Sequence, residues 1–159
     1  MSEFSEAETF SPSAHLFSAV TTDPIQRLQP KIPVTVRPTT LISDAVNLMQ
    51  EKRIGALLVE EDQKLVGIIT ERDMLFKVLG KGVDIHNTTV KEIMTSNPES
   101  LTPEDQILYA LNRMTIGGYR HIPLTDLEGH LTGVISVKDI VEYLVSLVEQ
   151  AVLASSDFA

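Results

Sequence analysis

The sequence predicts a mixed α/β fold in which two similar βαββα halves pack as one pseudo-twofold unit. A strand-to-helix junction occurs twice, at Gly67–Asp73 and at Gly133–Asp139. Both copies read Gly, two branched apolar residues, a hydroxyl residue, two free positions and Asp. An offset of about 65 residues relates much of the chain to itself. It matches Pro38, Ala45 and Met49 with Pro103, Ala110 and Met114.

An apolar stripe predicts the first helix of each half. In the first half the stripe is Ile42, Ala45, Val46 and Met49, and in the second it is Ile107, Ala110, Leu111 and Met114. This i, i+3, i+4, i+7 spacing places four apolar side chains on one face of a helix. We expect helices at Ile42–Lys52 and Glu104–Thr115, the second with Thr102 as N-cap, Pro103 at the first position and Asp105 completing a capping-box-like pattern.

The remaining elements follow from apolar runs bounded by polar turns. Short first strands are expected at Val34–Val36 and Ser100–Leu101, and strand pairs at Gly55–Val59 with Leu65–Ile69 and at Arg120–Leu124 with Leu131–Ile135. Closing helices should begin at Thr70 and Ser136, and the first should stop at Gly80–Gly82. A short helical turn is expected at Val90–Met94, inside the connecting segment. One half, at about 50 residues, is too small to be stable alone.

These elements divide the chain into four parts. We expect an N-terminal lead-in at residues 1–30, repeat 1 at 31–82, a linker with repeat 2 at 83–150, and a C-terminal tail at 151–159. The lead-in is rich in Ser, Thr, Glu and Pro and should be disordered or partly ordered. The alternative to full disorder is that Phe4, Phe10 and Phe17 dock on the folded body or on a second subunit.

Composition narrows the class of protein. The 159 residues carry 22 acidic and 13 basic side chains, and the net charge of −9 argues against nucleic acid or an anionic membrane surface as partner. No apolar run approaches the roughly 18 residues of a membrane span. The chain has no cysteine, and residues 1–20 contain Glu but no Lys or Arg, so we expect a cytoplasmic protein without a signal or transit peptide. His15, His86, His121 and His130 show no close metal-ligand spacing, so no metal site is expected.

The repeated junction carries the candidate chemistry. Thr70 with Asp73, and Ser136 with Asp139, place a hydroxyl and a carboxylate at a helix N-terminus, where both a sugar diol and a phosphate can be held. The alternative is a capping box that stabilises the helix without any ligand. Basic residues inside each motif and on the middle strand of repeat 2 favour a phosphate ligand. They are Arg72, Lys138, Arg120 and His121.

With these motifs the chain resembles a tandem pair of cystathionine-β-synthase (CBS) domains, the regulatory unit called a Bateman module. The resemblance covers about residues 31–150 and rests on the repeat, both Gly-x-x-Thr/Ser-x-x-Asp motifs and the strand Arg120–Pro123. It implies a cleft between the repeats that binds adenosine-type ligands (AMP, ADP, ATP or S-adenosylmethionine). In such a site Asp139 would hold the ribose and Ser136 would sit beside the phosphate.

The resemblance also implies a second, weaker site. Arg120 and His121 would contact phosphate and Lys138 could assist, whereas Asp73 and Thr70, with Arg72 nearby, would form the equivalent site in repeat 1. There, Gly55 and Ala56 stand where repeat 2 has Arg120 and His121. We therefore expect the Ser136/Asp139 site to be the stronger. The alternative for His121 is a hydrogen-bonded core residue.

The last helix predicts self-association. Ile140, Leu144, Leu147 and Val148 form one apolar stripe, and Val141, Val145 and Val152 form another. A helix with two apolar sides needs two partners, and we expect the second to be another subunit, in a homodimer through the helices that include Ile140–Val148. The alternative is deeper burial within the monomer. Overall, we expect a non-catalytic ligand sensor that acts on an unknown protein target, with no catalytic residues. The competing hypothesis is a dimerisation module that binds no ligand.

Overall fold

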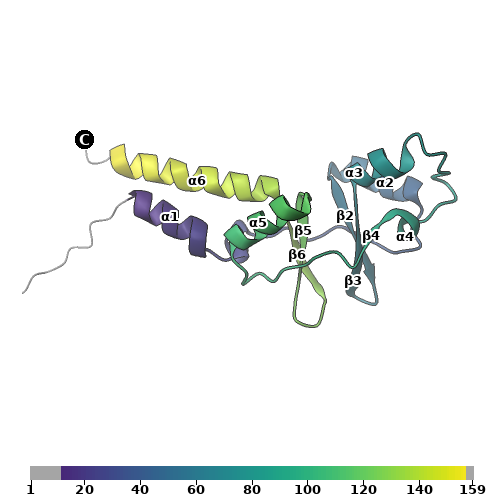
Figure 1. Cartoon of the computed structure of the whole chain (residues 1–159), viewed down its shortest axis with the longest axis horizontal. Helices are drawn as coiled ribbons and strands as arrows, with labels where there is room; N and C mark the ends of the chain where they lie inside the picture. Colours follow the sequence, from purple (N-terminus) through teal and green to yellow (C-terminus); the bar gives the residue numbers. More distant parts are fainter. Residues whose placement is uncertain (1–11, 157–159) are drawn as a thin grey trace, which may run out of the picture.

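The computed structural model describes residues 12–156, and it contains two sheets flanked by helices (Figure 1). A pair of helices at the two ends of the described chain extends from the second sheet. In chain order the elements are α1 (Pro12–Thr22), η1 (Ile25–Leu28), β1 (Thr35–Val36), α2 (Ile42–Lys52), β2 (Ala56–Glu61), β3 (Lys64–Thr70), α3 (Glu71–Asp73), η2 (Met74–Val78), α4 (Val90–Ile93), β4 (Thr95–Ser96), α5 (Ile107–Gly117), β5 (His121–Thr125), β6 (Leu131–Ser136) and α6 (Val137–Ser156).

The two sheets have the same plan. In repeat 1 the order is β1-β2-β3-β4, with β1 parallel to β2 and the other pairs antiparallel. In repeat 2 the hairpin β5–β6 forms the centre. A parallel bridge from Leu101 to Leu124 takes the place of β1, and an antiparallel bridge from Lys31 to Val134 takes the place of β4. The predicted α/β repeat is thus confirmed.

Each half is completed by the segment that precedes the other half. Strand β4 lies in the linker ahead of α5 of repeat 2 but pairs with β3 of repeat 1, and Lys31 lies ahead of β1 of repeat 1 but pairs with β6 of repeat 2. The short helical turns η1 and α4 are exchanged between the halves in the same way. The amide N–H of Ile25 donates to Asp105 (2.8 Å) in repeat 2, and that of Val90 donates to Thr40 (2.8 Å) in repeat 1. The halves are therefore mutually dependent.

Two hydrophobic cores reflect this exchange. Ile25 is fully buried in the core of repeat 2, although it lies in the segment that the sequence analysis treated as a lead-in. Val90 and Ile93 are buried in the core of repeat 1. The remaining buried members of the repeat 2 core are Leu101, Ile107, Ala110, Met114, Ile122, Leu124, Ile135 and Ile140. Those of the repeat 1 core are Ile42, Ala45, Met49, Leu57, Val59, Ile69 and Val78.

The structure corrects one predicted helix start. Helix α5 begins at Ile107 rather than Glu104. The predicted bonds between Thr102 and Asp105 do form, with the Thr102 N–H donating to Asp105 Oδ2 (2.7 Å), but they close a turn. Gln106 is extended, and the carbonyls of Pro103 and Asp105 accept hydrogen bonds from the η1 segment instead of continuing a helix. The other helix of this pair, α2, has the predicted bounds.

The terminal segments form a helical pair. Helix α1, which the sequence analysis did not predict, packs against α5 and α6, and α6 continues through Ser156 (Figure 1). Phe17 on α1 is 73% exposed, so it does not dock on the folded body. Phe4 and Phe10 lie outside the described residues. Within residues 12–156 no helix is both long and apolar enough to cross a bilayer.

Candidate functional site

Both repeated junctions form capping boxes with the same geometry. The backbone N–H and the hydroxyl of Thr70 each donate to Asp73 Oδ2 at 2.8 Å, and the Asp73 N–H donates back to Thr70 Oγ1 at 3.3 Å. For Ser136 and Asp139 the corresponding distances are 2.7, 2.7 and 3.3 Å. The capping box, which was the alternative to a ligand site for these motifs, is therefore present in both repeats. It uses only Oδ2 of each carboxylate and fixes the direction of the other oxygen.

The second oxygen of each carboxylate is held by a lysine, and the two lysines come from different places. Asp73 Oδ1 lies 2.7 Å from the Nζ of Lys77, one helical turn further along. Asp139 Oδ1 lies 2.8 Å from the Nζ of Lys31, which belongs to the segment before β1. Neither lysine was predicted from the sequence. The i, i+4 spacing could have revealed Lys77, but only the fold brings Lys31 to Asp139.

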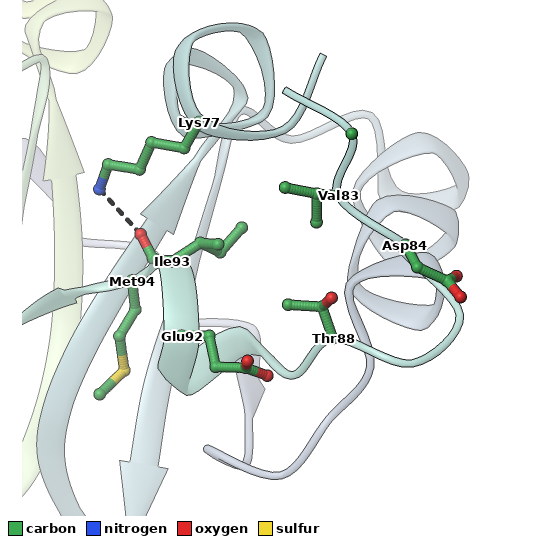
Figure 2. Close-up of a pocket in the computed structure, with 8 residues that line it drawn as sticks. Lys77, Val83, Asp84, Thr88, Glu92, Ile93 and Met94 are labelled. Atoms are coloured by element: carbon green, nitrogen blue, oxygen red, sulfur yellow. Dashed lines mark hydrogen bonds between the residues drawn. The ribbon is translucent and has the colours of Figure 1, made fainter. Parts of the chain in front are cut away.

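A cavity of about 580 Å³ lies beside Lys77 in repeat 1. Lys77 Nζ also donates to the carbonyl of Ile93 at 2.8 Å, and Val83 and Thr88 point into the cavity (Figure 2). The acidic residues of the lining have structural partners. Glu92 accepts from the Thr89 N–H, and Asp84 accepts from Asn87 and from the backbone N–H of His86.

A smaller cavity of about 280 Å³ lies beside Asp139, and part of its lining corresponds to that of the first, with Arg27 and Leu28 in the places of Glu92 and Ile93. Its lining differs in charge. Tyr143 stands where repeat 1 has Lys77, and its hydroxyl donates to Asp23. Burial and this bond raise the pKa of Tyr143 to about 12. The cavity is lined by Arg27, Leu28, Gln29, Lys31, Asp139, Glu142 and Tyr143.

The carboxylate of Asp139 stays ionised in this setting. Burial by itself raises its pKa, but the hydrogen bonds from Lys31 and Ser136 outweigh burial, and the pKa lies below the ordinary value. The same contact with Asp139 raises the pKa of Lys31. Only 11% of the Asp139 side chain is exposed, against 68% for Lys31. The pair thus joins a buried, anchored carboxylate to a largely exposed lysine.

The structure places His121 beside the Ser136/Asp139 motif. His121 pairs with Ser136 across β5 and β6, and the carbonyl of the preceding Arg120 accepts from the Val137 N–H at 3.0 Å. Burial lowers the pKa of His121, while the carboxylates of Glu71 and Asp139 act in the opposite direction. His121 therefore feels the charges of Asp139 in the second motif and of Glu71 in the first, and Arg120 next to it in the chain is exposed.

The pseudo-equivalent place in repeat 1 has a glycine, Gly55, with the carboxylate of Glu71 next to it. A Cβ atom on Gly55 would lie 3.3 Å from the Glu71 side chain, whose carboxylate covers this position. The two remaining predicted residues are engaged elsewhere. Arg72 donates to the Gly118 carbonyl at 2.8 Å, and Lys138 Nζ lies 3.5 Å from Glu142 on the exposed side of α6.

One group of possible metal ligands occurs in the β5–β6 turn, where histidine spacing predicted none. Oxygen and nitrogen atoms of Asp126, Glu128 and His130 lie within 4.8 Å of one another. Asp126 accepts from the backbone N–H groups of Glu128 and His130, both at 2.9 Å, and its other oxygen lies 3.0 Å from His130 Nδ1. These hydrogen bonds close the turn, and the turn by itself explains why the three side chains lie close together.

Comparison with known proteins identifies the fold. A family model described as the CBS domain matches residues 14–80 and again residues 90–146. The chain belongs to the CBS-domain family. CBS domain-containing protein CBSCBSPB3 of Arabidopsis thaliana is 32% identical over 124 residues, which make up 78% of this chain and 22% of the plant protein. This chain thus spans about a fifth of that CBS protein.

Two solved CBS structures have the same fold. A protein with CBS domains from Burkholderia ambifaria MC40-6 is 35% identical, with a TM-score of 0.72 over 77% of this chain and 93% of that one. The CBS domain pair of protein MJ0100, in complex with 5′-methylthioadenosine and S-adenosyl-L-methionine, gives a TM-score of 0.68 over 76% of this chain and 98% of that one. At 24% identity the second likeness shows the fold alone. CBS pairs are regulatory units, and these names indicate no catalytic activity.

Proposed function

We propose that this CBS pair is a non-catalytic regulatory module that binds adenosine-type ligands between its repeats. The candidate ligands are AMP, ADP, ATP and S-adenosylmethionine. The observation that carries the proposal is the pair of capped carboxylates, Asp73 and Asp139, each with one oxygen held only by a lysine. A carboxylate fixed in this way can accept hydrogen bonds from ribose hydroxyls once the lysine moves aside, while the capping box keeps its orientation.

The residues have distinct roles in this proposal. Asp139 accepts the ribose hydroxyls, Ser136 lies beside the phosphate, and Arg120 and His121 bind the phosphate. Lys138 assists after it leaves Glu142. In the other site Asp73 and Thr70 hold the ribose, with Arg72 nearby.

Signalling follows from the exchange of segments between the halves. Lys31 is part of the stretch that joins η1 to β1 and also bridges to β6. A ligand that engages Asp139 therefore acts on a stretch that connects both repeats. Binding shifts the arrangement of the repeats only if the ligand prefers one arrangement over another, and the same preference would transmit the signal to a protein target.

The experiment is calorimetric titration with AMP, ADP, ATP and S-adenosylmethionine. We expect micromolar binding of at least one ligand and a loss of about 10- to 100-fold for Asp139→Ala, because hydrogen bonds to charged groups contribute about 1.5–3 kcal/mol. Asp126→Ala is the matched control, since it removes an exposed carboxylate of the same repeat. Wild-type affinity in folded Asp139→Ala protein would refute the site, and circular dichroism would establish that this variant is folded.

A second candidate function, homodimerisation without a ligand, is favoured by the exposed face of α6. Val141, Val145, Val148 and Val152 follow a 4-3-4 spacing and are 47–59% exposed. This is the spacing of a seam between two packed helices. At the pseudo-equivalent positions of repeat 1, Leu75 in η2 and Leu79 directly after it are also exposed. Because both repeats present an apolar face at the same place, we infer that a second copy of the chain covers them.

Sedimentation tests this candidate. We expect the wild type to be a dimer and Val145→Glu to be a monomer, because a charge buried in the seam would be unpaired. Leu127→Glu is the control, since Leu127 is 98% exposed in the β5–β6 turn, away from α6. A wild type that remains a monomer at high concentration would refute the dimer. A dimer that binds none of the four ligands would make dimerisation the function.

A further inference from the structure

We propose that Lys31 restricts the Asp139 site to adenosine compounds that carry a phosphate, whereas the Asp73 site accepts uncharged or cationic ones. This inference rests on the proposed function, because it concerns the ligand class of the same two sites. It makes Lys31 a specificity-determining residue and gives the two repeats different ligands.

The first step is that Lys31 competes with the ribose. Asp139 Oδ2 belongs to the capping box, and its Oδ1 is held by Lys31 at 2.8 Å. A ribose diol can reach Oδ1 only if the ammonium group moves. The Asp139 side chain is nearly buried, so the carboxylate cannot turn to water for compensation. Every ligand of this site must therefore displace Lys31.

The second step is that the displaced ammonium group is best compensated by an anion on the ligand. The cavity already contains a second cation, Arg27, and its other carboxylate, Glu142, has Lys138 at 3.5 Å. A neutral nucleoside would break the Lys31–Asp139 pair and leave two cations beside one another. A nucleotide would replace the lost partner with a phosphate, to which lysine and arginine bind well.

The third step is the contrast with repeat 1, where the pseudo-equivalent positions are less positive. Glu92 stands in the place of Arg27, and Thr95, which pairs with Ile68 as Lys31 pairs with Val134, stands in the place of Lys31. Gly55 and Ala56 replace Arg120 and His121, and Glu71 replaces Val137. These five exchanges all make the Asp139 side more favourable to an anion.

Three other exchanges make the Asp139 side less favourable to an anion. Their effect is limited because the residues involved already have partners. Lys77 corresponds to Tyr143, but its ammonium group is shared between Asp73 and the Ile93 carbonyl. Asp23 corresponds to Thr88, but it accepts the hydrogen bond of Tyr143. Glu142 corresponds to Phe76 and pairs with Lys138. Lys77 also stays within its own helical segment when it is displaced, next to the carbonyl that already binds it, so a neutral ligand is tolerated there.

The test is calorimetric titration of AMP and adenosine into Asp73→Asn protein, which leaves the Asp139 site to be read alone. We expect AMP to bind at least tenfold more tightly than adenosine. In the added presence of Lys31→Met this preference should fall about tenfold or more, because AMP loses a cation and adenosine no longer has to break an ion pair. Lys31→Arg should retain the preference, and the matched control Lys77→Met should leave it unchanged.

The outcomes separate this inference from the proposed function. If AMP binds and Asp139→Asn abolishes binding, but Lys31→Met leaves the AMP-to-adenosine ratio unchanged, Lys31 is not a specificity residue and the proposed function stands. If the wild-type protein binds no adenosine compound, both fall. An equal loss of AMP and adenosine binding in Lys31→Met would also overturn the inference, since it would indicate a structural role only.

Discussion

The two repeats have nearly the same backbone plan and very different charges at their candidate sites. Both have the capping box, the exchanged segment and a lysine at the free carboxylate oxygen. They differ at the positions that would meet a phosphate, where repeat 2 has Arg120 and repeat 1 has Gly55 covered by Glu71. The difference teaches that the shared residues of the motif form the same local structure in both repeats, while the unmatched residues around it give the two proposed sites different charges.

The motif glycines show how the fold depends on the exchange. A Cβ atom on Gly67 would lie 2.4 Å from Met94 Sδ and 3.2 Å from the Thr95 carbonyl, just where β4 crosses repeat 1. A Cβ on Gly133 would lie 3.0 Å from the Pro30 ring, where the N-terminal segment crosses repeat 2. At both glycines an added methyl group would meet the segment from outside the repeat, which pairs with the same strand at or next to this residue.

The largest expected effect tests whether the N-terminal segment is as much a part of repeat 2 as α4 is of repeat 1. Ile25→Ala should lower the free energy of unfolding by about 2–5 kcal/mol, because it leaves a cavity in a fully buried core. Denaturant unfolding measures this. Ile32→Ala is the control, since Ile32 is 91% exposed and should change stability by less than about 0.5 kcal/mol. Equal effects of the two would show that residues 24–28 do not belong to the core.

A smaller effect tests the crossing segments. Gly133→Ala should destabilise the protein by about 1–3 kcal/mol, because the Pro30 ring is rigid and cannot move aside without the backbone.

Gly67→Ala should lower the free energy of unfolding less in the presence of Met94→Ala than alone, because the closest atom to the new methyl group belongs to a flexible side chain. A double-mutant cycle by thermal unfolding measures this coupling. Additive effects at Gly67 and Met94 would contradict the proposed contact.

Much of the fold could be predicted from the sequence because it depends on local patterns and on the repeat. The apolar stripe gave the bounds of α2, and the hydroxyl and Asp of each junction form the capping boxes that begin α3 and α6. The repeat itself could have corrected the start of α5, since Ile42 corresponds to Ile107. Helix α1 was missed because its Ser- and Thr-rich sequence has no sustained period, and it is packed against α5 and α6.

Only those residues of the candidate site that lie on one hairpin and the helix after it could be predicted from the sequence. Ser136, Asp139 and His121 come together because they lie on paired or adjacent positions of one hairpin and helix. Lys31 and Arg27 join them through the exchange of segments, a long-range arrangement that no spacing reveals. The same exchange explains why the segment before repeat 1 looked like a lead-in. In that segment, the counterpart of the helical turn Val90–Ile93 is η1, a single short turn that follows α1.

The smallest expected effect concerns His121 and sharpens the comparison by making repeat 2 resemble repeat 1. Burial holds the pKa of His121 below its ordinary value of 6.5, so the unfolded chain binds the proton more readily than the folded one. As the pH falls through about 6.5, the unfolded state takes up more protons and the folded protein loses stability. His121→Ala introduces the residue type found at Ala56 and should reduce the loss of stability between pH 7 and pH 5.5. The exposed His86→Ala is the control, and denaturant unfolding at each pH is the measurement. A wild-type pH dependence in His121→Ala would mean that His121 takes up its proton equally well in the folded and unfolded states, and repeat 2 would then differ from repeat 1 by fixed charges alone.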